Sequence, residues 1–206
     1  MIDTILNDLK YPEERTYRHH VKNMLELGRM AKKGHDQARL TLSHLAQGDD
    51  WARRISLYSC FTSGDGARVI LSITDMSERV RQLAYRVATH TCDDEQVLHA
   101  LQTAWDTHRH IPLLKSLHRK GRVVVIDRYL NWLLSEQHIK DLIDALPWGS
   151  ESSVKRHLKH AISQPTLHFW PRLARLHPTI LASILLQRLK LAQGEPDPVD
   201  RRLIDT

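Results

Sequence analysis

The stretch Ala67 to Ala88, ARVILSITDMSERVRQLAYRVA, decides the fold of this chain, because it contains two amphipathic helices joined by a short polar turn. The turn is Asp75-Met76-Ser77-Glu78. Apolar residues after it recur at i, i+3, i+4, i+7 and i+8, which places one stripe along one side of the second helix: Val80, Leu83, Ala84, Val87 and Ala88. Asp75 and Glu78 have the spacing of a capping box with Asp75 as the N-cap. The stretch therefore predicts a helix–turn–helix unit.

The same unit recurs along the chain in imperfect form. Residues 38–40 resemble residues 67–69 at an offset of 29. The helices that follow, at 52–55 and 80–83, align at an offset of 28. Residues 142–162 repeat the pattern downstream. One hairpin cannot bury its own apolar stripe, so the recurrence predicts hairpins that stack on one another.

Length and composition indicate a single folded helical domain. The chain has 206 residues, of which 41% are hydrophobic and 6% aromatic. The β-branched run at 123–126 continues to residue 134 without a turn residue, so it is interpreted as the start of a buried helix. Cys60 and Cys92 provide no disulfide framework and no paired metal-ligand spacing.

Targeting signals are not evident. Charged residues interrupt the N-terminus where a signal peptide needs a continuous apolar core. The longest apolar stretch, 180–186, is far shorter than the ~20 residues of a membrane span. We therefore expect an intracellular protein, cytoplasmic or nuclear, with no membrane span.

The predicted segments are an N-terminal helical cap at 1–35, helical repeats at 36–193 and a tail at 194–206. Within the repeats, the predicted hairpins lie at 36–63, 67–88, 93–135, 138–163 and 166–192. Asp36 and either Asp49 or Asp50 are the predicted N-caps of the first hairpin. Pro112 removes a backbone donor and clashes with the preceding turn, which predicts a break or sharp kink near His110.

The hairpin period near 30 residues, Asp75 at the turn and the following Val80-Arg81-x-x-Ala84 resemble HEAT repeats of the armadillo-type superfamily. The resemblance is good for residues 67–88 and fair for 38–60 and 142–162. It implies an all-α fold, namely a right-handed α-α superhelix of about five helical hairpins. It also implies a concave face lined by the second helices, which in HEAT proteins mostly acts as a scaffold and binding surface.

Some positions depart from the HEAT pattern. The repeat around Pro112 is overlong, and polar or small residues replace apolar stripe residues at three positions: Ser56, Ser59 and Cys60.

Positive charge is concentrated toward the C-terminus. Residues 150–193 contain seven basic residues and one acidic residue, so this window carries the whole net charge of +6. Stacking would align them with basic residues of earlier second helices, and the candidate binding residues are Arg53, Arg54, Arg81, Arg86, Lys155, Arg156 and Lys159. They form either a basic stripe for nucleic acid, an acidic protein segment or anionic headgroups, or ordinary solvated helix faces.

Catalytic and metal signals are weak. Among the 14 histidines, the pair His157 and His160 has no third ligand at a useful spacing, so we expect no metal and no cofactor. The chain has no Gly-rich phosphate loop and no nucleophile elbow. The resemblance extends to the HEAT-like alkylpurine DNA glycosylases, which pair aromatic residues with an acidic residue on a basic concave surface. It would make Asp106 the catalytic candidate, with Trp105 beside it.

The leading hypothesis is a non-catalytic scaffold that binds a macromolecular partner, an acidic protein segment or nucleic acid, on its concave surface. The alternative is a nucleic-acid-binding protein, including a HEAT-like DNA glycosylase. A third hypothesis is a structural module whose partner face is apolar.

Overall fold

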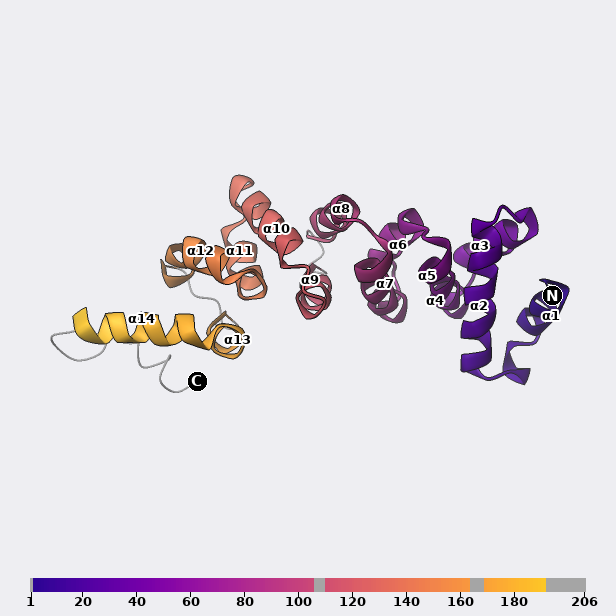
Figure 1. The fold of residues 1–206 in the computed structure, drawn as a ribbon, viewed down its shortest axis with the longest axis horizontal. Helices are drawn as coiled ribbons and strands as arrows, with labels where there is room; N and C mark the ends of the chain where they lie inside the picture. Colours follow the sequence, from indigo (N-terminus) through magenta and orange to yellow (C-terminus); the bar gives the residue numbers. More distant parts are fainter. Residues whose placement is uncertain (1, 106–109, 164–168, 192–206) are drawn as a thin grey trace. The chain divides into compact units, whose positions relative to one another are not determined.

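A computed structural model describes residues 2–105, 110–163 and 169–191, and this part of the chain contains helices and no strands (Figure 1). The prediction of an all-α fold is confirmed. The chain divides into two compact units, Met1–Ser116 and Leu117–Thr206, and each is described by itself. The predicted tail at 194–206 lies outside the described residues.

The first unit begins with a helix pair that precedes the predicted repeats. Its elements are α1 (Ile2–Lys10), η1 (Pro12–Glu14), α2 (Tyr17–Lys32), α3 (Asp36–Gln47), α4 (Asp50–Ser56), η2 (Leu57–Ser59), α5 (Cys60–Ser63), α6 (Gly66–Ile73), α7 (Glu78–Thr91) and α8 (Asp94–Ala104). The next helix, α9 (His110–Arg119), crosses the boundary between the units. Pro112 lies near the beginning of α9, and because residues 106–109 lie outside the described residues, the break predicted near His110 stays a prediction.

Helices of the first unit pack in two rows. α2 contacts η2 and α5, and α7 in turn contacts α4, η2 and α5. We call α2, α4–η2–α5 and α7 the second-helix layer. α3 and α6 pair with α4 and α7, respectively, as the predicted hairpins at 36–63 and 67–88 require (Figure 1).

The apolar stripe of α7 is buried as its periodicity predicts. Its five members are at most 2% exposed: Val80, Leu83, Ala84, Val87 and Ala88. At ~25 cal/mol per Å² of apolar surface, such a stripe is the main force that holds α7 against its neighbours.

The polar residues that interrupt the stripe of the preceding segment are also buried. Ser56 and Ser59 donate their hydroxyls to the carbonyls of Arg53 and Ser56, three residues back. The helix tightens there into the 3-10 segment η2. The small residues also allow a close approach, because a Cβ at Gly28 would lie 2.2 Å from the backbone oxygen of Ser59. Thr62 fixes the contact by donating to the Leu25 carbonyl at 2.7 Å.

Two of the predicted N-caps are wrong. Ser77, not Asp75, is the N-cap of α7, and its side chain makes no capping hydrogen bond. The Asp75 carboxylate instead accepts from the Ser77 N–H and from Arg53. His35, not Asp36, precedes α3, whereas Asp49 caps α4 by accepting from the Ala52 N–H, as predicted.

The second unit contains α10 (Val123–Ser135), α11 (Ile139–Ala145), η3 (Leu146–Trp148), α12 (Glu151–Ser163), α13 (Phe169–Leu176) and α14 (Pro178–Leu191). The buried helix predicted from the β-branched run is confirmed as α10. The turn at η3 is held by two histidine rings: His118 lies 2.9 Å from the carbonyl oxygen of Trp148 and His177 lies 3.0 Å from that of Pro147. Burial lowers the pKa of His177, which favours the neutral ring.

Candidate functional site

The exposed side of the second-helix layer carries a row of aromatic rings. Tyr17 comes from α2, Tyr58 from η2, Phe61 from α5 and His90 from α7. Successive ring centroids are 6.1, 6.3 and 5.7 Å apart. Tyr17 is 41% exposed and Phe61 38%, so large aromatic surface faces solvent. The row runs across all three segments of the layer.

Neighbouring rings of the row meet edge to face or tilted. The interplanar angle is 79° between Tyr17 and Tyr58 and 62° between Phe61 and His90, while Tyr58 and Phe61 are tilted by 39°. The hydroxyls of Tyr17 and Tyr58 hydrogen-bond at 3.3 Å, which fixes two of the rings relative to each other. An edge-to-face pair places the edge of one ring against the face of its neighbour, so the aromatic surface that a ligand can reach is the exposed part of the rings, chiefly of Tyr17 and Phe61.

Two arginines accompany the row. The Arg54 guanidinium lies 5.3 Å from the centroid of the Tyr17 ring, within cation–π range. Arg86 is exposed on α7. Burial and the hydrogen bond with Tyr58 raise the pKa of Tyr17 to about 12, and the charges of Arg54 and Arg86 act in the opposite direction. Both cations therefore lie close enough to influence the ring row. We call Tyr17, Arg54, Tyr58, Phe61, Arg86 and His90 the aromatic–arginine face.

Neither guanidinium of this face has an anion partner among the described residues. Throughout the described ranges, the side chains of Arg54 and Arg86 form no hydrogen bond and no ion pair. A cation without a carboxylate partner keeps its full charge for a ligand.

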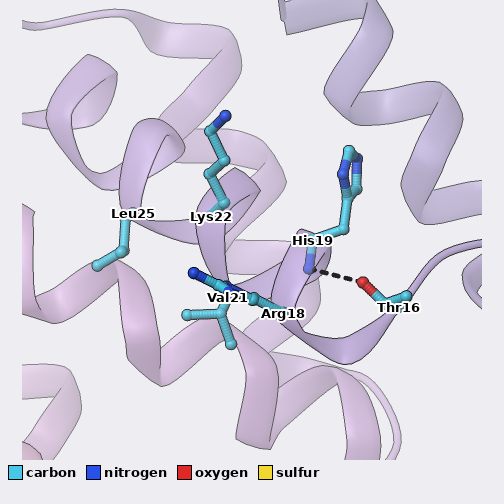
Figure 2. A pocket seen from close by; sticks show the side chains of 6 residues that line it. All are labelled: Thr16, Arg18, His19, Val21, Lys22 and Leu25. Carbon is cyan, nitrogen blue, oxygen red and sulfur yellow. Dashed lines mark hydrogen bonds between the residues drawn. The ribbon is translucent and has the colours of Figure 1, made fainter.

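A shallow groove along the first half of α2 adjoins Tyr17 (Figure 2). Its lining residues are Thr16, Arg18, His19, Val21, Lys22 and Leu25. Val21 and Leu25 follow Tyr17 at intervals of four residues and so lie on the same side of the helix. Figure 2 shows them pointing to one side of α2 and Lys22 to another. Arg18 and Lys22 are exposed, so this groove adds an apolar strip with two more cations.

Two of the predicted binding arginines lie together at a different place. Arg53 donates to both carboxylate oxygens of Asp75, at 2.9 and 3.1 Å, and to the Gly48 carbonyl at 2.8 Å. Arg81 donates to the carbonyls of Asp75 and Met76 at 2.6 and 2.7 Å. We call Arg53, Asp75 and Arg81 the arginine clamp. It joins α4 to the turn between α6 and α7.

The clamp carboxylate is held ionised. Burial favours the neutral form of Asp75, but hydrogen bonds from Arg53 and the Ser77 N–H, with the charges of Arg53 and Arg81, outweigh it and lower the pKa.

The remaining predicted binding residues belong to α12 of the second unit. Lys155 and Arg156 are exposed, and Lys155 pairs with Glu151 at 2.7 Å, which lowers the pKa of that carboxyl. The side chain of Lys159 lies outside the described residues. A single basic stripe from Arg53 to Lys159 thus stays a prediction, because the units are described separately.

No arrangement of the described residues supports the enzyme hypothesis. Trp105 is half-buried at the end of α8, and Asp106 lies outside the described residues. His157 is buried, and its ring centroid is 6.4 Å from that of His160. Over the ranges that the structure describes, no group of three or more His, Cys, Asp or Glu side chains is arranged to hold a metal ion.

Sequence reasoning missed the aromatic part of the face. The offset of 28 residues between second helices, applied to Arg86, leads back to Tyr58, and an offset of 29 applied to His90 leads back to Phe61. These alignments pair Arg with Tyr and His with Phe, and they need two different offsets because η2 interrupts the helical period before Phe61, so no recurring residue type marks the row.

Comparison with family profiles, curated proteins and solved structures gave no match for this chain. Among the described helices, none combines the length and apolar character that a membrane crossing requires.

Proposed function

We propose that this chain is a non-catalytic HEAT-like repeat protein that binds an anionic macromolecular partner through the aromatic–arginine face. The observation that carries the proposal is the pair Arg54 and Arg86. Arg54 lies over the partly exposed ring of Tyr17, Arg86 is exposed on α7 one helical turn before His90, and neither has an anion partner among the described residues. HEAT-like hairpins in a right-handed superhelix would present this face as part of a concave surface. The two-row packing of the first unit and the arginine clamp between consecutive hairpins support that architecture.

The charge distribution favours a polyanion over a neutral partner. Arg18 and Lys22 on α2 add two exposed positive charges to those of Arg54 and Arg86. The carboxylate of Glu26 on the same helix is paired with Arg29 at 2.7 Å, so it offsets little of this charge. Clustered cations attract an anionic chain over distances of about 10 Å at 0.1 M salt and raise its association rate.

Binding of polyanions across a salt series tests the proposal. Fluorescence anisotropy of the full chain with labelled oligonucleotides and with a labelled polyglutamate should show affinity that falls as salt rises. A double substitution, Arg54→Gln with Arg86→Gln, should weaken binding to the polyanion by about tenfold or more, since hydrogen bonds to charged groups contribute about 1.5–3 kcal/mol each.

A matched control uses an exposed cation of the same unit that is not a member of the face. Arg39 on α3, which pairs with Asp36, provides it. Arg39→Gln should leave the affinity within about twofold. No salt-sensitive binding to any polyanion, or equal losses in all of these variants, would end the proposal.

A further inference from the structure

The ring row gives the aromatic–arginine face more than a positive charge. An acidic protein segment needs only cations, and it gains little from the partly exposed rings of Tyr17 and Phe61. Nucleobases are planar and stack on aromatic side chains, with about 1–3 kcal/mol lost per base when a stacking residue is replaced by alanine. Partly exposed Tyr17 and Phe61, next to uncommitted arginines, therefore fit a nucleic acid better than an acidic peptide.

The ring spacing distinguishes a single strand from a duplex. Successive centroids in the row are 5.7 to 6.3 Å apart. The rise per nucleotide within a stacked strand of B-DNA is about 3.4 Å. Bases that sit on successive rings must therefore be separated from one another. A duplex keeps its bases stacked and paired, whereas a single strand can splay them out.

The cations lie where the backbone of such a strand would run. Arg54 is at the Tyr17 end of the row, and Arg86 lies one helical turn before His90 on α7. Arg18 and Lys22 continue the positive charge along α2. Arg54 and Arg86 thus accompany the ring row across the second-helix layer, and Arg18 and Lys22 add positive charge on a neighbouring side of α2 (Figure 2).

We propose that the aromatic–arginine face binds single-stranded nucleic acid, with bases stacked on Tyr17, Tyr58 and Phe61 and phosphates paired with Arg54 and Arg86. The inference rests on the proposed function, since it names the class of polyanion that this same face takes. Stacking has no preference among bases, so the binding is sequence-tolerant.

Competition between ligand classes tests the inference on the full chain. Labelled oligo(dT) and oligo(rU) of about 12 nucleotides, within the site sizes of single-strand binders, are compared with a duplex and a polyglutamate of equal charge. At least one single strand should bind about tenfold or more tightly than both the duplex and the polyglutamate. The affinities for oligo(dT) and oligo(rU) show whether DNA or RNA is the preferred ligand. Equal or tighter binding of the duplex or the polyglutamate would overturn the inference.

A ring substitution separates stacking from charge. Phe61→Leu keeps an apolar side chain but removes the ring, and it should weaken oligo(dT) binding about fivefold or more while the salt dependence stays unchanged. Arg86→Gln should instead reduce the slope of log affinity against log salt by about 0.7. The control is Leu71→Ala on α6, which alters a 77%-exposed apolar residue outside the second-helix layer and should leave binding unchanged.

Cross-linking of the unaltered protein to a 5-iodouracil strand does not depend on how the variants fold. Adducts on peptides that contain Tyr17, Tyr58 or Phe61 support the inference, and adducts confined to the second unit contradict it. If the arginine substitutions weaken every polyanion but Phe61→Leu changes nothing, the inference fails and the proposed function stands. If no polyanion binds, the proposed function itself has failed.

Discussion

Two pairs of arginines in the same two helices have opposite surroundings. Arg53 and Arg81 are bound into the arginine clamp around Asp75, while Arg54 and Arg86 belong to the aromatic–arginine face and have no internal anion partner. Arg53 and Arg54 are consecutive, so their side chains leave α4 about 100° apart. One step along the helix separates an arginine that joins two hairpins from one that faces the ring row.

The difference teaches that a basic residue must be judged by its partner. The Arg53 guanidinium is 29% exposed and makes a bidentate pair, a geometry that contributes stability because the Asp75 carboxylate is only 14% exposed. Its charge is neutralised within the protein. Arg54 has a similar position in the sequence but keeps its charge for a ligand. Substitutions should therefore divide into those that change stability and those that change affinity.

The largest expected effect is on the packing of α2 against η2 and α5, within the second-helix layer. Gly28→Ala would place a methyl group 2.2 Å from the Ser59 oxygen and from the Thr62 hydroxyl. Gly to Ala within a helix ordinarily stabilises by about 0.5–1 kcal/mol, but here overpacking should lower the free energy of unfolding by about 3 kcal/mol. Urea denaturation of the full chain measures it.

The double variant Gly28→Ala with Thr62→Ala shows which contact is responsible. It removes the hydroxyl clash but leaves the clash with the backbone oxygen of Ser59, so most of the loss should remain. Full recovery in the double variant would show that the backbone contact between α2 and η2 does not limit this position.

The second prediction compares the loss of a clamp arginine with the loss of a face arginine. Arg53→Ala should lower the free energy of unfolding by about 2 kcal/mol, because it leaves a mostly buried carboxylate without its bidentate partner. Arg54→Ala should change stability by less than about 1 kcal/mol, in line with the loss of a partly exposed cation–π contact, but should weaken oligonucleotide binding. Urea denaturation and anisotropy on both variants give the comparison. If Arg53→Ala and Arg54→Ala lower the free energy of unfolding equally, the proposed difference between the arginine clamp and the aromatic–arginine face is wrong.

The sequence predicts the buried side of α7 correctly, but it does not predict the clamp around Asp75 or the ring row. Periodicity alone places Val80 and Leu83 in the core, because one buried side of a helix is a local property. The capping role predicted for Asp75 is wrong because α7 begins at Glu78 with Ser77 as its N-cap. The Asp75 carboxylate accepts from Arg53, 22 residues earlier, a pairing that no local spacing encodes. The ring row is hidden for a similar reason. Phe61 follows a 3-10 interruption that breaks the helical period, and Tyr17 lies ahead of the recognised repeats.

A third prediction sharpens the comparison with charge held constant. Arg53→Lys keeps the positive charge but cannot form the bidentate pair with Asp75, and it should cost about 1 kcal/mol in unfolding free energy. Arg54→Lys should leave stability within about 0.5 kcal/mol and oligonucleotide affinity within about threefold, since a phosphate accepts either cation. Thermal unfolding and anisotropy measure both. If the Arg53→Lys variant is as stable as the original chain, only the charge, and not the geometry, matters at the clamp.

The smallest expected effect is the pH dependence that the clamp contributes. The pKa of Asp75 lies below its ordinary value of about 3.9, so the folded state releases this proton more readily than the unfolded state. The corresponding stability is present above about pH 4 and is lost as pH falls through the lowered pKa. Because Asp8 and Glu151 also have lowered pKa values, the clamp contribution is the difference between the original chain and Asp75→Asn in urea denaturation at pH 5 and at pH 3. Arg53→Gln should remove most of the same difference, whereas Arg54→Gln should retain it, because only Arg53 donates to the Asp75 carboxylate among these two arginines.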